Sequence, residues 1–205
     1  MAVTRIDFIR HGEPQGGAMY RGSAVDHPLS EKGWAQMRRA LGDACLWNAV
    51  VSSPLQRCLA FAQEVGQRCG LPVSVEPDFR EVGFGSWEGR TRAQIQATDP
   101  EGYAAFYRDP VNARPAGAED LIAFGRRVSA ALERLIENHP GDHLLVVAHA
   151  GVIRAALGHV LQAPPACWYR TRVDNAALTR FEAHPETGLQ LIFHNRPKLD
   201  CQEKS

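Results

Sequence analysis

The stretches IDFIRHGE (residues 6–13) and LLVVAHAG (residues 144–151) decide the fold, because each is an apolar run that ends in a histidine and a glycine. A continuous apolar run is typical of a strand buried on both faces of a parallel sheet. Helical patterns alternate with such runs, as in the three- and four-residue spacing of apolar side chains over residues 121–136. The alternation predicts an α/β fold, a three-layer α/β/α sandwich with a mainly parallel central sheet.

Shorter signals predict the remaining elements. Ser30 is placed to cap a helix that runs to Leu41, and Ser53 followed by Pro54 is typical of the start of a second helix, which Gly70 ends after Cys69. Strands are expected over residues 3–9, 49–51, 73–75 and 143–148, a helix over 152–161, and a terminal hairpin from strands at 178–181 and 189–193.

Residues 83–118 interrupt this alternation with several glycines, prolines and aromatic side chains. Such punctuation predicts short helices in a lid-like insertion rather than further strands. The 205 residues, of which 44% are hydrophobic and 22% charged, suit an ordinary globular chain. We therefore expect a single domain over residues 1–205, with the insertion inside it.

Charge and hydropathy exclude several classes of function. The 23 basic residues balance the 23 acidic ones, so the chain lacks the basic excess of a nucleic-acid or membrane-surface protein. Arginine supplies 20 of the 23 cations, which fits the composition of a GC-rich genome. No apolar stretch has the length of a membrane span or a signal peptide. We expect a cytoplasmic protein with no nucleic-acid or membrane partner.

The cysteine and histidine spacings predict neither a disulfide framework nor a bound cofactor. The five cysteines are odd in number and form no CxxC pair, which is typical of free thiols in a reducing compartment. No HxH or HExxH spacing predicts a metal site, and no GxGxxG or GxxxxGK[ST] spacing predicts a nucleotide site. We expect no metal and no cofactor.

The two strand-end histidines carry the chemistry. His11 and His149 each follow a predicted central strand, and ligands of open α/β sheets bind in the crevice at those carboxyl ends. Arg10 would join them there, and the backbone amides after the strands could face an anion. Imidazole and guanidinium groups in one crevice suit a phosphoryl group best.

Five ordered blocks resemble the histidine phosphatase superfamily, which includes the cofactor-dependent phosphoglycerate mutases. They are IRHGE at 9–13, RGSAVDHPLSEKG at 21–33, SSPLQRC at 52–58, REVGFGSWEG at 80–89 and VVAHAGVIR at 146–154. The resemblance covers residues 5 to about 160 and implies a phosphoglycerate mutase-like fold. It also implies phosphoryl transfer through a phosphohistidine, without a metal.

The same resemblance implies a role for each site residue. His11 is the nucleophile, while Arg10, Arg57 and His149 hold the phosphoryl oxygens. Glu81 is the acid that protonates the leaving group, and burial beside its apolar neighbours would favour its protonated form. Glu13 is the competing acid, although its place directly after Gly12 favours an orienting role.

The chain departs from the family pattern after RHGE. Many members carry Ser or Thr next and Asn three residues later, whereas this chain has Pro14 and Gly17. We expect Ser23 or Arg21 to supply the missing phosphate contact. Ala150 replaces the commoner glycine after the second histidine, and its backbone amide is expected to contact phosphate.

The expected function is a metal-independent phosphomonoesterase that acts on a small phosphorylated metabolite. Several stretches look most like the alpha-ribazole-5'-phosphate phosphatases of cobalamin biosynthesis, and Trp87, Tyr103 and Tyr107 could stack on such a nucleoside. A phosphoglycerate mutase-like phosphotransferase is one alternative, and a catalytically silent phospho-ligand binding module is another. The terminal hairpin or an edge strand is the expected surface for a homodimer.

Overall fold

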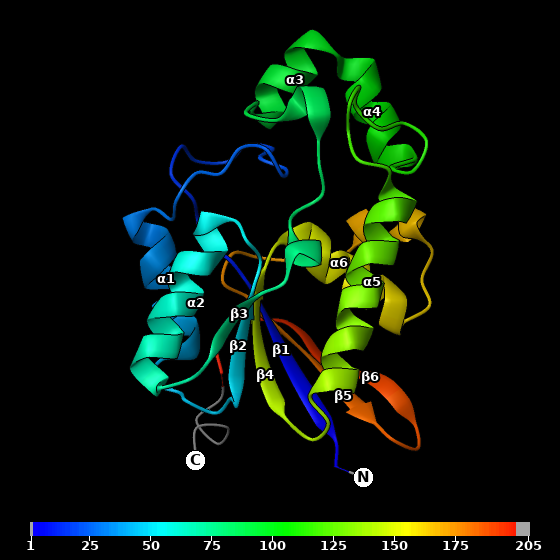
Figure 1. Cartoon of the computed structure of the whole chain (residues 1–205). Helices are drawn as coiled ribbons and strands as arrows, with labels where there is room; N and C mark the ends of the chain where they lie inside the picture. The colour runs from blue at the N-terminus through cyan, green and yellow to red at the C-terminus, as the bar shows by residue number, and fades with distance from the viewer. Residues whose placement is uncertain (1, 200–205) are drawn as a thin grey trace.

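In the computed structural model, which describes residues 2–199, the strands form one sheet in the order β3–β2–β4–β1–β5–β6 (Figure 1). They are β1 (Thr4–Arg10), β2 (Ala49–Ser52), β3 (Val73–Val75), β4 (His143–Ala148), β5 (Leu178–His184) and β6 (Gly188–Arg196). The first four run parallel to one another, and β5 pairs antiparallel with both β1 and β6. This mainly parallel sheet confirms the predicted fold class.

Two long helices cover each face of the sheet (Figure 1). They are α1 (Glu31–Leu41) and α2 (Gln56–Cys69) on one face, and α5 (Leu121–Asn138) and α6 (Ala150–Val160) on the other. Leu144 and Val146 of β4 pack toward α5 and α6, whereas Leu145 and Val147 pack toward α1 and α2. Strand β4 is therefore buried on both faces, as its apolar run predicted. Within residues 2–199, no helix has the length and hydropathy needed to cross a membrane.

The predicted helix ends are right for α1 and wrong for the start of α2. The Gly33 N–H donates to Oγ of Ser30, 3.0 Å away, so Ser30 caps α1 as expected. Helix α2 instead begins at Gln56 after Leu55, and it has no side-chain cap. Ser53 is not its cap, because it lies three residues before the helix, where its hydroxyl accepts the Leu55 N–H at 3.3 Å and bonds a histidine described below. Gly70 ends α2 in the left-handed conformation, at φ +65°.

The predicted insertion contains η2 (Gly85–Trp87), α3 (Arg92–Thr98) and α4 (Pro100–Arg108), and the two α-helices stand beyond the carboxyl ends of the strands (Figure 1). Trp87 is only 4% exposed and packs in the apolar core. The hydroxyls of Tyr20 and Tyr107 lie 2.7 Å apart and join α4 to the loop before α1. That the insertion acts as a lid stays a prediction, as does a single domain over residues 1–205. The remaining short helices are η1 (Pro77–Phe79) and η3 (Pro165–Arg170).

The prediction of free thiols is wrong for one pair, because Cys45 and Cys69 form a disulfide. The last turn of α2 lies against the loop that follows α1, where Arg68 donates to the carbonyl oxygens of Gly42 and Ala44. The fold thus brings together two cysteines that are 24 residues apart, which sequence spacing does not reveal. Cys58 and Cys167 are free thiols, and Cys201 lies outside the described residues.

Candidate active site

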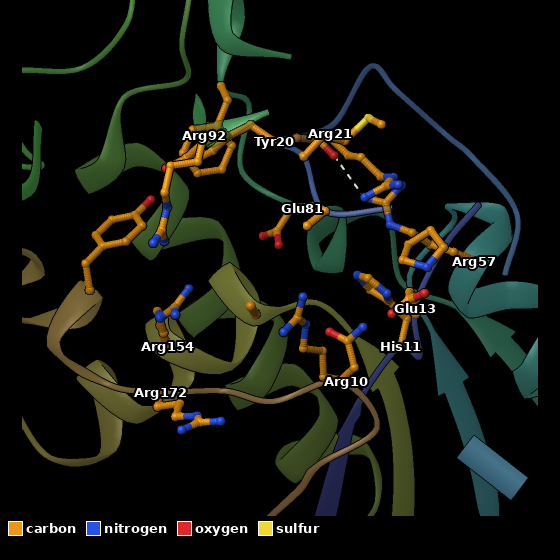
Figure 2. Close-up of a pocket in the computed structure, with 18 of the residues that line it drawn as sticks. Arg10, His11, Glu13, Tyr20, Arg21, Arg57, Glu81, Arg92, Arg154 and Arg172 are labelled. Atoms are coloured by element: carbon orange, nitrogen blue, oxygen red, sulfur yellow. Dashed lines mark hydrogen bonds between the residues drawn. The ribbon is translucent and has the colours of Figure 1, made fainter. Parts of the chain in front are cut away.

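The parallel pairing of β1 and β4 brings the two predicted histidines together. Arg10 is opposite Ala148 in the register, so His11 and His149 leave the same edge of the sheet. The backbone N–H of His11 donates to the carbonyl oxygen of Ala148, 2.9 Å away. The centroids of the two imidazole rings lie 5.2 Å apart. His11 lines a cavity of about 750 Å³ at this edge (Figure 2).

The surroundings of His11 favour a neutral imidazole with one defined tautomer. Its Nδ1 lies 2.7 Å from the carbonyl oxygen of Gly12, and because a carbonyl only accepts hydrogen bonds, Nδ1 carries the proton. Burial and the charges of Arg10 and Arg57 hold the pKa of His11 well below its usual value. Its Nε2 therefore keeps a lone pair, which is the form that attacks phosphorus.

His149 lies behind His11 and is completely buried. Its Nε2 is 2.7 Å from Oγ of Ser53, and burial followed by the charge of Arg57 holds its pKa well below the usual value. The ring contacts His11 but is not among the residues that line the cavity. His149 thus contacts the edge of the His11 ring, and the hydroxyl of Ser53, which was expected to cap a helix, holds Nε2 of His149. The contact of His149 with phosphoryl oxygens stays a prediction.

Three arginines line the cavity around His11 and hold the loops that enclose it, Arg21 and Arg57 buried and Arg10 half-buried. Arg10 donates to the carbonyl oxygen of Val173, 2.7 Å away, and burial lowers its pKa to about 10, which leaves it charged at neutral pH. Arg57 is 1% exposed and bonds the carbonyl oxygens of Gly22 and Val25, each 3.0 Å away. Arg21 donates to two carbonyl oxygens of its own loop.

Each of these three arginines also has a buried Nε–H group without an acceptor in the described part of the chain. Among the described residues, six buried side-chain nitrogen or oxygen atoms have no hydrogen-bond partner, and three of them are Nε of Arg10, Arg21 and Arg57. A buried N–H without an acceptor is costly, so these three N–H groups gain from any acceptor that enters the cavity. Three such donors beside one imidazole suit the oxygens of a phosphoryl group.

Glu81 faces the cavity between Arg10 and Tyr20 (Figure 2). Its two carboxylate oxygens accept the backbone N–H of Val82, 3.0 Å away, and of Gly151, 3.2 Å away in the first turn of α6. A Cβ on Gly151 would lie 2.2 Å from Oε1 of Glu81, so only glycine allows this approach. Glu13 also lines the cavity, but Lys32 pairs with its carboxylate at 2.7 Å.

The candidate replacements for the missing phosphate contact separate in the structure. Arg21 and Ala150 line the cavity, as does Gly17 itself. Ser23 is not among the lining residues, and its backbone N–H donates to Glu88 instead. The sequence did not predict four further arginines that line the cavity: Arg92, Arg154, Arg170 and Arg172. Only Arg154 lies within one of the quoted sequence blocks, and no spacing signal marks the other three.

The described part of the chain holds no group of three or more histidine, cysteine or acidic side chains that could bind a metal ion. Independence of metals stays a prediction.

Comparison with known proteins identifies the family. Residues 6–195 match the model of the histidine phosphatase superfamily (branch 1). The chain belongs to this superfamily. Sequence relatives of the histidine phosphatase chain include a bifunctional protein of Mycobacterium tuberculosis, 34% identical over 92% of this chain and 53% of that protein. The chain thus spans about half the length of that relative.

Other members match over nearly their full length. An adenosylcobalamin/alpha-ribazole phosphatase of Escherichia coli is 30% identical over 94% of this chain and 96% of that protein. The solved structure of a mycobacterial glucosyl-3-phosphoglycerate phosphatase superposes with a TM-score of 0.81 at 27% identity, covering 95% of this chain and 99% of that one. These histidine phosphatase neighbours confirm the predicted fold.

Proposed function

We propose that the chain is a metal-independent phosphomonoesterase that transfers a phosphoryl group to Nε2 of His11 and then to water. The observation that carries the proposal is the neutral His11 ring, with its proton on Nδ1, beside three buried arginine Nε donors that lack acceptors. Family membership supports the same activity. A nucleophile and a ring of donors for the equatorial oxygens are what phosphoryl transfer requires.

Two displacements complete the reaction. Nε2 of His11 attacks phosphorus, the P–O ester bond breaks, and Glu81, as the general acid, gives a proton to the departing alkoxide. A water molecule then attacks the phosphohistidine, Glu81 accepts a proton from that water, and the P–N bond breaks. The products are an alcohol and inorganic phosphate, and Glu81 regains the proton that it lost.

The substrate is proposed to be a small organic phosphate. Alpha-ribazole-5'-phosphate, an intermediate of cobalamin biosynthesis, is supported by the name of the E. coli relative and by the aromatic rings of Phe84, Tyr107 and Tyr169 along the cavity. The mycobacterial structural neighbour is instead named a glucosyl-3-phosphoglycerate phosphatase. A cytoplasmic location and a homodimer remain predictions.

The decisive experiment looks for the phosphohistidine. The EDTA-treated protein is mixed with p-nitrophenyl phosphate, quenched in alkali and digested, and the peptide containing His11 is weighed by mass spectrometry. We expect a phosphorylated peptide and turnover without added metal. His11→Ala should lose both, whereas His184→Ala, a hairpin histidine far along the chain, should keep both. The proposal would be contradicted if His11→Ala turned over substrate at the wild-type rate, or if EDTA abolished turnover by the wild-type protein.

The mutase-like alternative predicts a different result for the same protein. In this case 2,3-bisphosphoglycerate stimulates the isomerisation of 3-phosphoglycerate, and the rate of isomerisation exceeds the rate of phosphate release. The phosphohistidine would then transfer its phosphoryl group to a second hydroxyl rather than to water.

A further inference from the structure

The cavity contains more positive charge than one phosphoryl group needs. Its lining includes seven arginines and two glutamates. Arg10, Arg21 and Arg57 lie on the His11 side of Glu81, and we call them the phosphate end. Figure 2 shows Arg92, Arg154 and Arg172 on the other side of Glu81, where the leaving group of a phosphate ester would extend. Together with Arg170, these residues form what we call the arginine end.

Two of these arginines are held so that their terminal nitrogens stay available. Nε of Arg154 donates to the carbonyl oxygen of Thr171, 2.9 Å away, and its guanidinium carbon lies 5.4 Å from the centre of the Tyr169 ring. Nε of Arg172 pairs with Asp174 at 2.7 Å. Within residues 2–199, neither guanidinium has a hydrogen bond from its two terminal nitrogens.

The local charges are only partly balanced. Asp174 offsets the charge of Arg172, and its carboxylate is further bonded by Asn195. No acidic side chain among the described residues pairs with Arg154 or Arg170, and the two glutamates of the cavity lie elsewhere, Glu81 on backbone amides and Glu13 on Lys32. Because these positive charges repel one another, an anion that binds between them is attracted by all of them and relieves that repulsion.

We propose that the arginine end binds a second anionic group, carried by the leaving-group part of the substrate. The inference rests on the proposed function, because it places that group relative to the phosphoryl group on His11. Arginine binds planar carboxylates and phosphates in a bidentate manner, which fits two guanidinium groups with free terminal nitrogens. A cavity of about 750 Å³ accommodates a small metabolite with both ends charged.

The consequence is a choice between substrate classes. The nucleoside released from alpha-ribazole-5'-phosphate carries no second anion and would leave the arginine end unneutralised. A phosphorylated hydroxy acid or sugar acid, or a bisphosphate, would satisfy both ends of the cavity. The second anionic group therefore favours those classes.

The test compares matched pairs of ligands as competitors of p-nitrophenyl phosphate hydrolysis, so that every compound yields an inhibition constant. In the first pair, 3-phosphoglycerate carries a carboxylate where glycerol 3-phosphate carries a hydroxymethyl group. In the second, fructose 1,6-bisphosphate carries a phosphate where fructose 6-phosphate carries a hydroxyl. We expect the charged member of at least one pair to bind about tenfold more tightly, as a charge-assisted contact implies. The pair that responds identifies carboxylate or phosphate.

Variants connect that preference to the arginines. Arg172→Gln and Arg154→Gln should each bring the ratio of the two inhibition constants close to one, whereas Arg39→Gln, on the exposed side of α1, should leave it unchanged. A wild-type ratio near one in both pairs, or a ratio that neither variant alters, overturns the inference. The phosphatase proposal fails on a different result, turnover of p-nitrophenyl phosphate that survives His11→Ala.

Discussion

The two ends of the cavity are built differently. At the phosphate end, Arg57 is 1% exposed, and backbone carbonyl oxygens fix the guanidinium groups of Arg10, Arg21 and Arg57. At the arginine end, the side chain of Arg172 is 81% exposed, and Arg92 and Arg170 are also exposed. Rigid donors suit a transition state whose geometry never changes, whereas solvated donors on loops can adapt to different leaving groups. We therefore expect catalysis to depend on the phosphate end and substrate specificity on the arginine end.

Glu81 stands between the two ends, and its replacement tests the division most strongly. Glu81→Gln removes the acid, so hydrolysis of alkyl phosphates such as glycerol 3-phosphate should slow by about 10²–10⁴-fold in kcat. p-Nitrophenolate leaves without protonation, so p-nitrophenyl phosphate should lose much less. Steady-state kcat for both substrates measures the contrast. Equal losses would show that Glu81 acts on the phosphoryl group rather than on the leaving group.

Arg57→Lys tests the rigidity of the phosphate end. Lysine keeps the charge, but it cannot reach the carbonyl oxygens of Gly22 and Val25 while also presenting a donor to phosphate. We expect kcat/KM to fall by about 10²–10³-fold, as it does when one transition-state donor is lost. The fall should be the same for 3-phosphoglycerate and glycerol 3-phosphate, unlike the selective effect of Arg172→Gln. If Arg57→Lys changed the ratio of kcat/KM between 3-phosphoglycerate and glycerol 3-phosphate, the phosphate end would also determine specificity. The division of roles between the two ends would then be wrong.

The sequence predicts the phosphate end far better than the arginine end, for a physical reason. His11 and His149 follow strands whose apolar runs and parallel pairing determine where the chain leaves the sheet. The register of β1 and β4 then determines that the two rings meet. Arg172 reaches the cavity from an irregular segment after η3, and no periodicity predicts the path of such a segment. The Cys45–Cys69 disulfide was missed for the same reason, since one of its cysteines lies in a loop.

Gly151→Ala tests how closely Glu81 must approach α6. The new Cβ would lie 2.2 Å from Oε1 of Glu81, so the carboxylate has to move and lose its bond to the Gly151 N–H. A displacement of this kind should cost about 10–10²-fold in kcat/KM for alkyl phosphates. The control is the double variant Glu81→Gln/Gly151→Ala. If the glycine acts through Glu81, the double variant loses little more than Glu81→Gln alone, and additive losses would contradict that reading.

The smallest expected effect is on stability, and it concerns the two buried histidines beside the phosphate end. Burial holds the pKa of His11 and of His149 well below the usual value of 6.5, so both stay neutral in the folded state while the unfolded chain binds protons below that pH. The free energy of unfolding should therefore fall as the pH drops from 7 to 5, by up to about 2 kcal/mol for each ring. Asp7 does not contribute in this window. Burial raises its pKa, but the hydrogen bonds from His143 and Arg180 outweigh that and hold it below 3.8.

Urea titrations at several pH values measure this slope directly. His11→Asn should make the slope shallower by one ring's share, because the variant has one fewer buried imidazole to keep neutral. His184→Asn, whose ring is only partly buried on the hairpin, should keep the wild-type slope. An unchanged slope in His11→Asn would mean that His11 takes up a proton in the folded state. In that case its Nε2 would lack the lone pair, and the phosphate end would hold a cation in place of a nucleophile.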